Sequence, residues 1–241
     1  MAKRRRRESE QLVMTYGTWG GWRPGAGRPP SKRRSKRVLH RPRPRVTRRT
    51  PAHITLKVVS ELASLRAKKK AAVIRRAFVA ACNGDGFRII DWSIQGNHLH
   101  LVVEADSTSQ LSRGMQGFCV RVARGLNSVA GRKGTVLRER YHVRVLETPA
   151  EVRNCRAYVI NNFRRHAAQA GRRVDKGWVD PLSSWAWFDG WRDLPAGLAR
   201  TAQRERAGPA PVAEAEGWML RVGWRKRGLV SVNEVPAQCE L

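Results

Sequence analysis

Acidic residues are scarce in this chain of 241 residues. Asp and Glu total 19 against 48 Lys and Arg, so the formal net charge is +29. A field of this sign favours polyanionic partners, with nucleic acid first and an anionic membrane surface second.

Long apolar runs and paired cysteines are also lacking. No stretch is long enough to span a bilayer, and no apolar core of a signal peptide follows the basic start at residues 3–7. No two cysteines form the C-x-x-C pair of a zinc or thiol-redox motif. They are Cys82, Cys119, Cys155 and Cys239. We expect a soluble, reduced, cytoplasmic protein with no membrane partner.

The first 50 residues differ in texture from the rest. They hold 17 Lys or Arg against two Glu, together with five prolines and little apolar periodicity. Such a segment cannot bury enough apolar surface to offset its ordering entropy, so residues 1–50 are predicted to form a mostly disordered basic arm. A solvated tail is one interpretation of its basic runs. Salt-dependent phosphate binding is the one we favour, and the predicted contacts are Arg33, Arg34, Lys36 and Arg37.

Regular elements begin at His53. Apolar alternation predicts strands over 53–59, 87–95, 98–105 and 142–146, and helical spacing predicts helices over 62–81, 108–129 and 151–170. The order is β-α-β-β-α-β with a further helix, which is the α+β, ferredoxin-like split βαβ plan with an antiparallel sheet.

Three segments make up the rest of the predicted organisation. Residues 51–171 form the main domain, and the Trp-rich segment 172–194 packs on it. Periodicity is weak beyond that point, so residues 195–241 are predicted to be a poorly ordered tail.

Two histidines one residue apart are the most informative feature. His98 and His100 lie in the strand 98–105, where side chains repeat every second residue, so both imidazoles project from one face. Two imidazoles on one face make half of a metal site. Taken alone, they fit hydrogen-bonded strand residues equally well.

The helix over 151–170 is the natural source of further functional groups. Tyr158 and Asn162 are four residues apart and share a helix face. Spacing alone also fits a Tyr158 ring anchored in the core. Tyr141, just before the last strand, is a rival reactive phenol, whereas Tyr16 lies in the flexible arm and lacks the fixed orientation that covalent catalysis requires.

Two motifs carry a family resemblance. The sequence resembles the HUH single-tyrosine transposases, and particularly their REP-associated branch, through Gln95-Gly96-Asn97-His98-Leu99-His100-Leu101 and Ala157-Tyr158-Val159-Ile160-Asn161-Asn162. The resemblance covers roughly residues 50–190. The Trp-rich stretch at 19–30 is similar to an arm found on some bacterial members.

The resemblance implies a metal-dependent nuclease and strand transferase for single-stranded DNA. His98 and His100 would bind Mg²⁺ or Mn²⁺, and Tyr158 would be the nucleophile that forms a 5′-phosphotyrosine link. Asn162 stands at the third-ligand position, where many relatives have the longer glutamine. His166, two turns beyond Tyr158, is a possible substitute. The domain over 51–171 would then be the HUH catalytic domain.

The expected partner is single-stranded DNA with hairpins, bound by a monomer or a homodimer in the bacterial cytoplasm at the nucleoid. Arg164 and Arg165 follow Tyr158 and are predicted to position the cleaved strand. Two alternatives stay open. One is a regulator that binds hairpins but does not cut them, and the other is a metal-independent RNA-binding or ribosome-associated protein.

Overall fold

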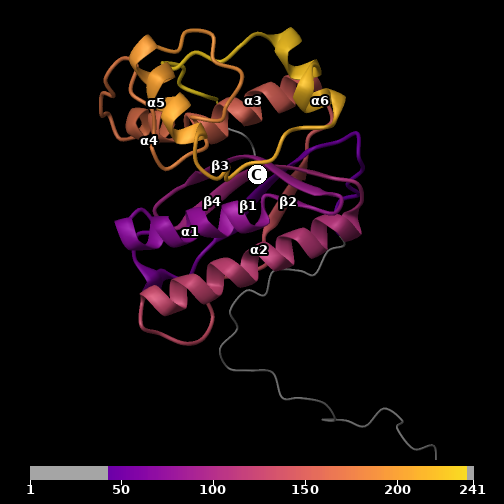
Figure 1. Ribbon diagram of the computed structural model, residues 1–241, viewed down its shortest axis with the longest axis vertical. Helices are drawn as coiled ribbons and strands as arrows, with labels where there is room; N and C mark the ends of the chain where they lie inside the picture. Colours follow the sequence, from indigo (N-terminus) through magenta and orange to yellow (C-terminus); the bar gives the residue numbers. More distant parts are fainter. Residues whose placement is uncertain (1–42, 238–241) are drawn as a thin grey trace, which may run out of the picture. The chain divides into compact units, whose positions relative to one another are not determined.

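The computed structural model describes residues 43–237 (Figure 1). Its centre is an antiparallel sheet in the order β2-β3-β4-β1-β5. The strands are β1 Ala52–Lys57, β2 Asn83–Gly84, β3 Phe87–Ile94, β4 His98–Ala105 and β5 His142–Val145. With β2 a short extension, this is the predicted α+β split βαβ arrangement, and the fold class is confirmed.

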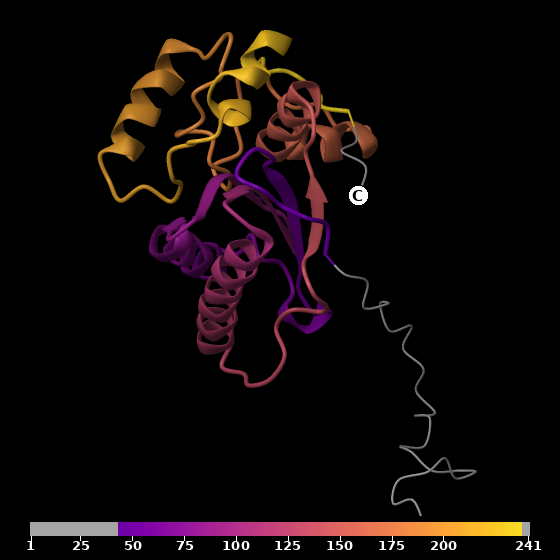
Figure 2. The same ribbon diagram turned by 90° about the vertical axis from the view of Figure 1, so that its right-hand side faces the viewer.

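One face of the sheet is covered by two helices, α1 Lys68–Ala81 and α2 Thr108–Val129 (Figures 1 and 2). The Ser107 side chain accepts a hydrogen bond from the Gln110 backbone and caps α2. Close packing is needed at Gly114, where a Cβ would lie 2.2 Å from the Phe87 ring. The apolar core on this face joins both helices to alternate residues of β1, β3 and β4.

The first helix begins later than its periodicity predicts. Residues 62–67 are not α-helical, and a single 3-10 turn covers Ser60–Leu62. Leu62 and Leu65 are still buried, and the Leu65 backbone N–H donates to Gly96 O at 2.7 Å. The backbone of this segment therefore bonds to the β3–β4 turn and not within a helix.

The opposite face is covered in part by α3 Pro149–Ile160, which begins with a capping box between Thr148 and Glu151. The predicted helix over 151–170 is wrong in one respect. It is interrupted at Asn161, whose φ of −101° and ψ of 20° separate α3 from α4 Asn162–Gln169. Tyr158 and Asn162 consequently lie on two successive helices.

A β-bulge in β3 decides which side chains face α3. The pairing of Ile89 with Val103 is followed by that of Asp91 with Val102, so Ile90 is one extra residue. Before the bulge the odd-numbered residues face α1 and α2, and after it Trp92 and Ile94 do. Asp91, Ser93 and Gln95 are thereby turned to the face that carries His100.

The C-terminal prediction is wrong for the part that the structure describes. Residues 195–237 include α5 Ala196–Arg206, α6 Trp218–Arg221 and a 3-10 turn, Gly223–Arg227. Trp224, Val230 and Val232 are fully buried in a second core with α3 and the Trp-rich segment. This region is the orange and yellow layer in Figure 2. It is ordered by tertiary contacts of scattered apolar residues and not by a local periodic pattern.

The domain also begins earlier than residue 51. Val46 is buried in the first core, and its backbone N–H donates to Thr108 Oγ1 at 3.0 Å. The other arm predictions, including the contacts at Arg33, Arg34, Lys36 and Arg37, lie outside the described residues. None of the helices between residues 43 and 237 has the length and apolar character of a bilayer span.

Candidate metal and nucleophile site

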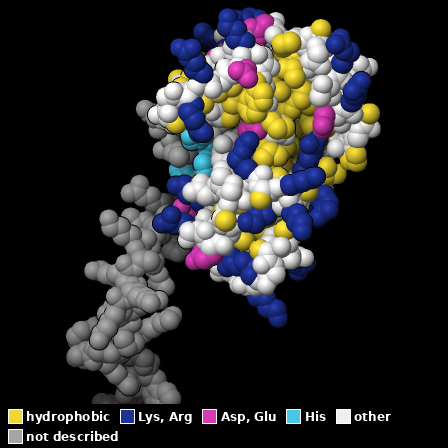
Figure 3. Space-filling model, turned by 90° about the vertical axis from the view of Figure 1, so that its left-hand side faces the viewer, with side chains coloured by type: hydrophobic (Ala, Val, Ile, Leu, Met, Phe, Trp, Pro, Cys, Tyr) yellow, Lys and Arg dark blue, Asp and Glu magenta, His cyan; other side chains and the backbone are white. Residues whose placement is uncertain are grey.

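The two histidines of β4 lie with their ring nitrogens converging. His98 Nε2 and His100 Nε2 are 3.0 Å apart, and the ring centroids are separated by 4.6 Å. His100 is buried and His98 is half-buried. Histidine side chains gather at one place on the surface of the domain (Figure 3). The strand alternation has therefore placed both imidazoles on the α3 face, as predicted.

Neighbouring polar atoms orient both rings. His98 Nδ1 is 2.7 Å from the Asn97 side-chain oxygen, so Nδ1 carries the hydrogen and the Nε2 lone pair of the neutral ring points toward His100. His100 Nδ1 lies 3.1 Å from His53 Nε2 and 3.3 Å from Thr55 Oγ1, both on β1. Such outer contacts hold metal-ligating imidazoles in place.

The site keeps these imidazoles neutral. Burial lowers the pKa of His98 to about 4, and the charges of His166, Lys57 and His53 act in the same direction. Burial also lowers the pKa of His100 well below its ordinary value, again with help from neighbouring histidines. Neutral imidazole is the form that binds a metal ion.

Tyr158 packs edge-on against His100 and His53. Its ring centroid lies 5.1 Å from that of His100 at an interplanar angle of 74°, and 5.9 Å from that of His53. Tyr158 is only 8% exposed, in the last turn of α3. The predicted nucleophile and the two predicted ligands are thus brought together by β4 and α3.

Asn162 is fully buried at the start of α4. Neither its amide nitrogen nor its amide oxygen has a hydrogen-bond partner among residues 43–237. His166, one turn further along the same face of α4, has its ring centroid 6.5 Å from that of His98. Leaving a buried amide unpaired costs about 1–3 kcal/mol, so an additional ligand at this position would be stabilising.

These donors fit a divalent ion. Two ligands bound at right angles and at about 2.1 Å are about 3.0 Å apart, which is the separation of the two Nε2 atoms. The unpartnered Asn162 oxygen supplies a neutral ligand atom of the type that Mg²⁺ and Mn²⁺ accept. No group of three or more His, Cys, Asp or Glu suited to one ion occurs in the described part of the chain. A metal would therefore rely on this amide and on substrate or water oxygens.

Tyr141 lies on the other side of the sheet. It packs against the first core, and the Arg43 guanidinium lies 4.1 Å from its ring centroid. The strand alternation directs Tyr141 with Val143 toward α1 and α2, away from His98 and His100. The rival nucleophile is thus separated from the imidazoles by the sheet.

The two predicted strand-positioning arginines have other partners. Arg164 is buried, its Nε donates to Val232 O at 2.8 Å, and one Nη donates to Asp175 O and Trp178 O at 2.9 Å each. These contacts do not support the prediction that Arg164 contacts DNA, because its donors hold the C-terminal segment on α4. Arg165 is half-buried and donates to Pro236 O at 3.4 Å.

Sequence reasoning missed the β1 and β3 contributions. His53 and Thr55 of β1 contact His100. Ser93 of β3 is the cross-strand partner of His100 in the pairing of β3 with β4. His142 of β5 pairs with Thr55 on the same face. The alternation of β1 was visible, but the register between strands distant in sequence was not. That register decides which residues meet.

Comparison with known proteins finds a family match over the central part of the chain. The family model described as "Transposase IS200 like" matches residues 50–162, which include both histidines, Tyr158 and Asn162. This segment is similar to IS200-like transposases, which agrees at the level of that family with the resemblance drawn from the two motifs. No curated protein matches the chain significantly.

Solved structures of transposases are similar at low identity. One is a REP-associated tyrosine transposase bound to a REP hairpin, with 13% identity, a TM-score of 0.47, and coverage of 74% of this chain and 94% of that one. Another is a putative transposase from Deinococcus radiodurans, with 9% identity, a TM-score of 0.35, and coverage of 52% and 92% respectively.

Proposed function

We propose that this protein is a divalent-metal-dependent endonuclease and strand transferase for hairpin-containing single-stranded DNA, with Tyr158 as its nucleophile. The observation that carries the proposal is the edge-on packing of Tyr158 on His100, with His98 Nε2 3.0 Å from His100 Nε2. The net charge of +29 supports a polyanionic substrate. The transposase family of residues 50–162 supports DNA as that substrate.

The chemistry follows from the groups present. The Tyr158 oxygen attacks the phosphorus, the bond from phosphorus to the 3′-oxygen breaks, and the strand downstream stays on the tyrosine as a 5′-phosphotyrosine ester. The phenol loses a proton and the departing 3′-oxygen gains one, so a free 3′-hydroxyl results. A phenol, with a reference pKa of about 10, ionises far more readily than a sugar hydroxyl.

The site residues would divide the remaining work. Mg²⁺ or Mn²⁺ held by His98, His100 and the Asn162 amide would neutralise the non-bridging phosphate oxygens. Asn97, His53 and Thr55 orient the imidazoles. Burial of Tyr158 in α3 limits the orientations of its ring, which lowers the entropic cost of reaching an in-line position. The ester retains the free energy of the phosphodiester, so a later 3′-hydroxyl attack rejoins strands.

Covalent trapping tests the proposal. A pool of 3′-labelled single strands bearing hairpins is incubated with the protein and Mn²⁺, and labelled protein is sought on denaturing gels. We expect a labelled adduct from the wild type and from Tyr141→Phe, a matched control on the opposite face, and none from Tyr158→Phe. Absence of an adduct from the wild type throughout the pool, or an equal yield from Tyr158→Phe, contradicts the assignment.

Hairpin binding without cleavage is a second candidate, favoured by one observation. No described carboxylate completes a three-residue metal group with the two imidazoles. This function requires that DNA binding be unchanged by EDTA and by Tyr158→Phe, and that no product form. The trapping experiment and a binding titration in EDTA separate the two candidates.

A further inference from the structure

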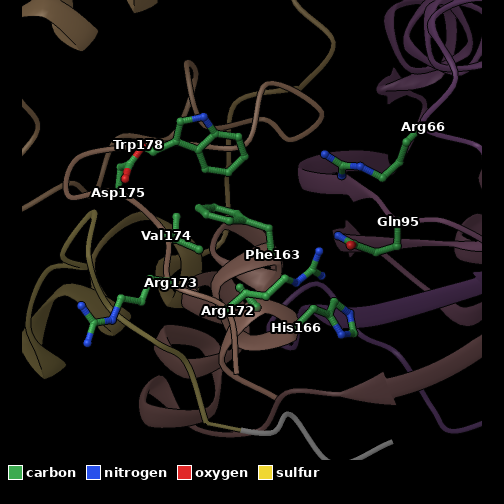
Figure 4. A pocket seen from close by; sticks show the side chains of 10 residues that line it. Arg66, Gln95, Phe163, His166, Arg172, Arg173, Val174, Asp175 and Trp178 are labelled. Carbon is green, nitrogen blue, oxygen red and sulfur yellow. The ribbon is translucent and has the colours of Figure 1, made fainter. Parts of the chain in front are cut away.

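A pocket lies beside the imidazole pair. It has a volume of about 460 Å³ and is lined from the end of β3, from α4 and from the loop that follows α4 (Figure 4). His166 belongs to its wall and lies 6.5 Å from His98 between ring centroids, so pocket and site are contiguous. Its wall includes Gln95, Phe163, His166, Arg172, Arg173 and Trp178.

An exposed aromatic surface forms one side of the pocket. Trp178 is 41% exposed, unlike the buried Trp185 and Trp224. The Phe163 ring meets the Trp178 ring edge-on, with centroids 4.4 Å apart. Arg164 donates a hydrogen bond to the backbone carbonyl of Trp178. The indole is thus held by its neighbours while one surface stays open, as required for stacking a nucleobase.

The polar groups of the pocket suit a phosphodiester and a base edge. Arg172 and Arg173 are exposed cations on the wall, against one carboxylate, Asp175. Arg66 also lines the wall, but its guanidinium is paired with Asp180 through two contacts of 2.8 Å and is already neutralised. The two arginines leave a net positive charge.

Gln95 adds a buried amide at the inner end of the pocket. It is 5% exposed and points into the cavity from the residue that follows β3, and its Nε2 donates to Ser93 Oγ at 3.2 Å. The amide oxygen remains for an N–H donor of an occupant. A flat aromatic group, cations and a single buried amide oxygen together match the three parts of a nucleotide.

We propose that this pocket binds one unpaired nucleotide of single-stranded DNA, adjacent to the phosphate that Tyr158 attacks. The base stacks on Trp178, its edge meets Gln95, and its phosphate lies near Arg172 and Arg173. The inference rests on the proposed function for its DNA substrate, but it concerns binding and is testable without metal or cleavage.

Binding of a twelve-residue thymidine oligonucleotide, dT12, in EDTA tests the pocket by fluorescence anisotropy. Loss of one stacked base predicts roughly 10-fold or more weaker binding for Trp178→Ala, with most of the affinity retained in Trp178→Phe. The slope of log affinity against log salt stays unchanged in both, because no cation is removed. Arg172→Ala combined with Arg173→Ala reduces that slope.

Trp218→Ala is the matched control, since Trp218 is 54% exposed and lies outside the pocket. Its affinity for dT12 is expected to stay within about twofold of the wild type. A dT12 carrying 5-iododeoxyuridine should photo-crosslink to the peptide that contains Trp178.

Several outcomes overturn the inference. They are wild-type affinity in Trp178→Ala, an equal loss in Trp218→Ala, or binding of the RNA oligomer rU12 but not of dT12. Trp178-dependent binding of dT12 without any Tyr158 adduct would sustain the pocket and refute the proposed cleavage. A Tyr158 adduct together with wild-type binding of dT12 in Trp178→Ala would sustain the proposed cleavage and refute the pocket.

Discussion

Arg156 donates a hydrogen bond from Nε to Asp91 Oδ2 at 2.7 Å, and both side chains are almost completely buried. The guanidinium also lies over the rings of Phe188 and Trp224, at 4.6 and 4.5 Å from their centroids. Arg156 precedes Tyr158 by two residues on α3, and Asp91 directly follows the bulge in β3. The ion pair therefore ties the helix of the nucleophile to the sheet that carries the imidazoles.

Removing one member of this pair should destabilise the fold. Arg156→Met leaves the Asp91 carboxylate buried without its partner, which costs about 3–5 kcal/mol of unfolding free energy. Urea denaturation measures the loss. The double variant Arg156→Met with Asp91→Leu removes both charges and should recover much of it. Equal losses in the single and double variants would show that packing, and not the unpaired charge, is responsible.

His100→Ala should abolish most Mn²⁺ binding. One of the two converging Nε2 donors is lost. The affinity measured by electron paramagnetic resonance should fall about 100-fold or more, because loss of an outer-shell partner alone costs about 10–100-fold. His142→Ala serves as control, because His142 is an exposed residue of β5. Equal affinity in the wild type and His100→Ala would exclude His100 as a ligand.

Asn162→Leu should separate stability from metal binding. Without metal, the substitution replaces an unpartnered buried amide by an apolar group of similar size, so the unfolding free energy should rise by up to about 1–3 kcal/mol. Mn²⁺ affinity should fall in the same variant. Melting in EDTA and in Mn²⁺ measures both effects. A variant that is less stable in EDTA and binds Mn²⁺ normally contradicts the proposed ligand.

Acid should weaken the metal-free fold through His98. Its pKa is about 4 in the folded protein, mainly because of burial, against about 6.5 in the unfolded chain. Above pH 6.5 the imidazole is neutral in both states and contributes nothing. Between pH 6.5 and pH 4 mainly the unfolded chain takes up the proton. The free energy of unfolding therefore decreases as the pH is lowered, by up to about 1.4 kcal/mol per pH unit.

Urea denaturation in EDTA at pH 7.5 and pH 5.0 measures this effect. His98→Gln should lose less stability over that interval than the wild type does. Parallel losses in the two proteins would show that His98 does not contribute to the pH dependence.

Arg164→Gln should lower stability without changing the electrostatics of DNA binding. The substitution removes donors to the carbonyls of Val232, Asp175 and Trp178. The salt slope of dT12 affinity should match that of the wild type, because this guanidinium is not free to contact phosphate. A reduced slope with unchanged stability would restore Arg164 as a DNA contact.

Much of the fold could be predicted because its signals are local. Ser107, and Thr148 with Glu151, are residue types that favour helix starts and do cap α2 and α3, and alternation located the four main strands within two residues. The break at Asn161 and the ordered segment after residue 195 could not be predicted. Both depend on contacts between residues far apart in sequence, such as Asn161 Nδ2 donating to Ser231 O at 3.0 Å.

The candidate site was predictable to a similar degree. His98 and His100 share a strand face by simple periodicity, but the family motif was needed to single out Tyr158. His53 and Thr55 required knowledge of strand register. The sequence pattern groups Trp178 with the buried tryptophans, because no local pattern distinguishes an indole at a pocket rim from one in the core.

The extra residue in β3 means that the site depends on residue number as well as on residue type. Because Ile89 pairs with Val103 and Asp91 with Val102, deleting Ile90 alone would join these two residues in regular alternation and leave Ser93 and Gln95 on the face of the site. Deleting Asp91 as well would exchange the two faces of the following half-strand, so that Trp92 would enter the site and Ser93 and Gln95 would enter the apolar core. Loss of both codons should therefore inactivate this protein more completely than loss of the Ile90 codon alone.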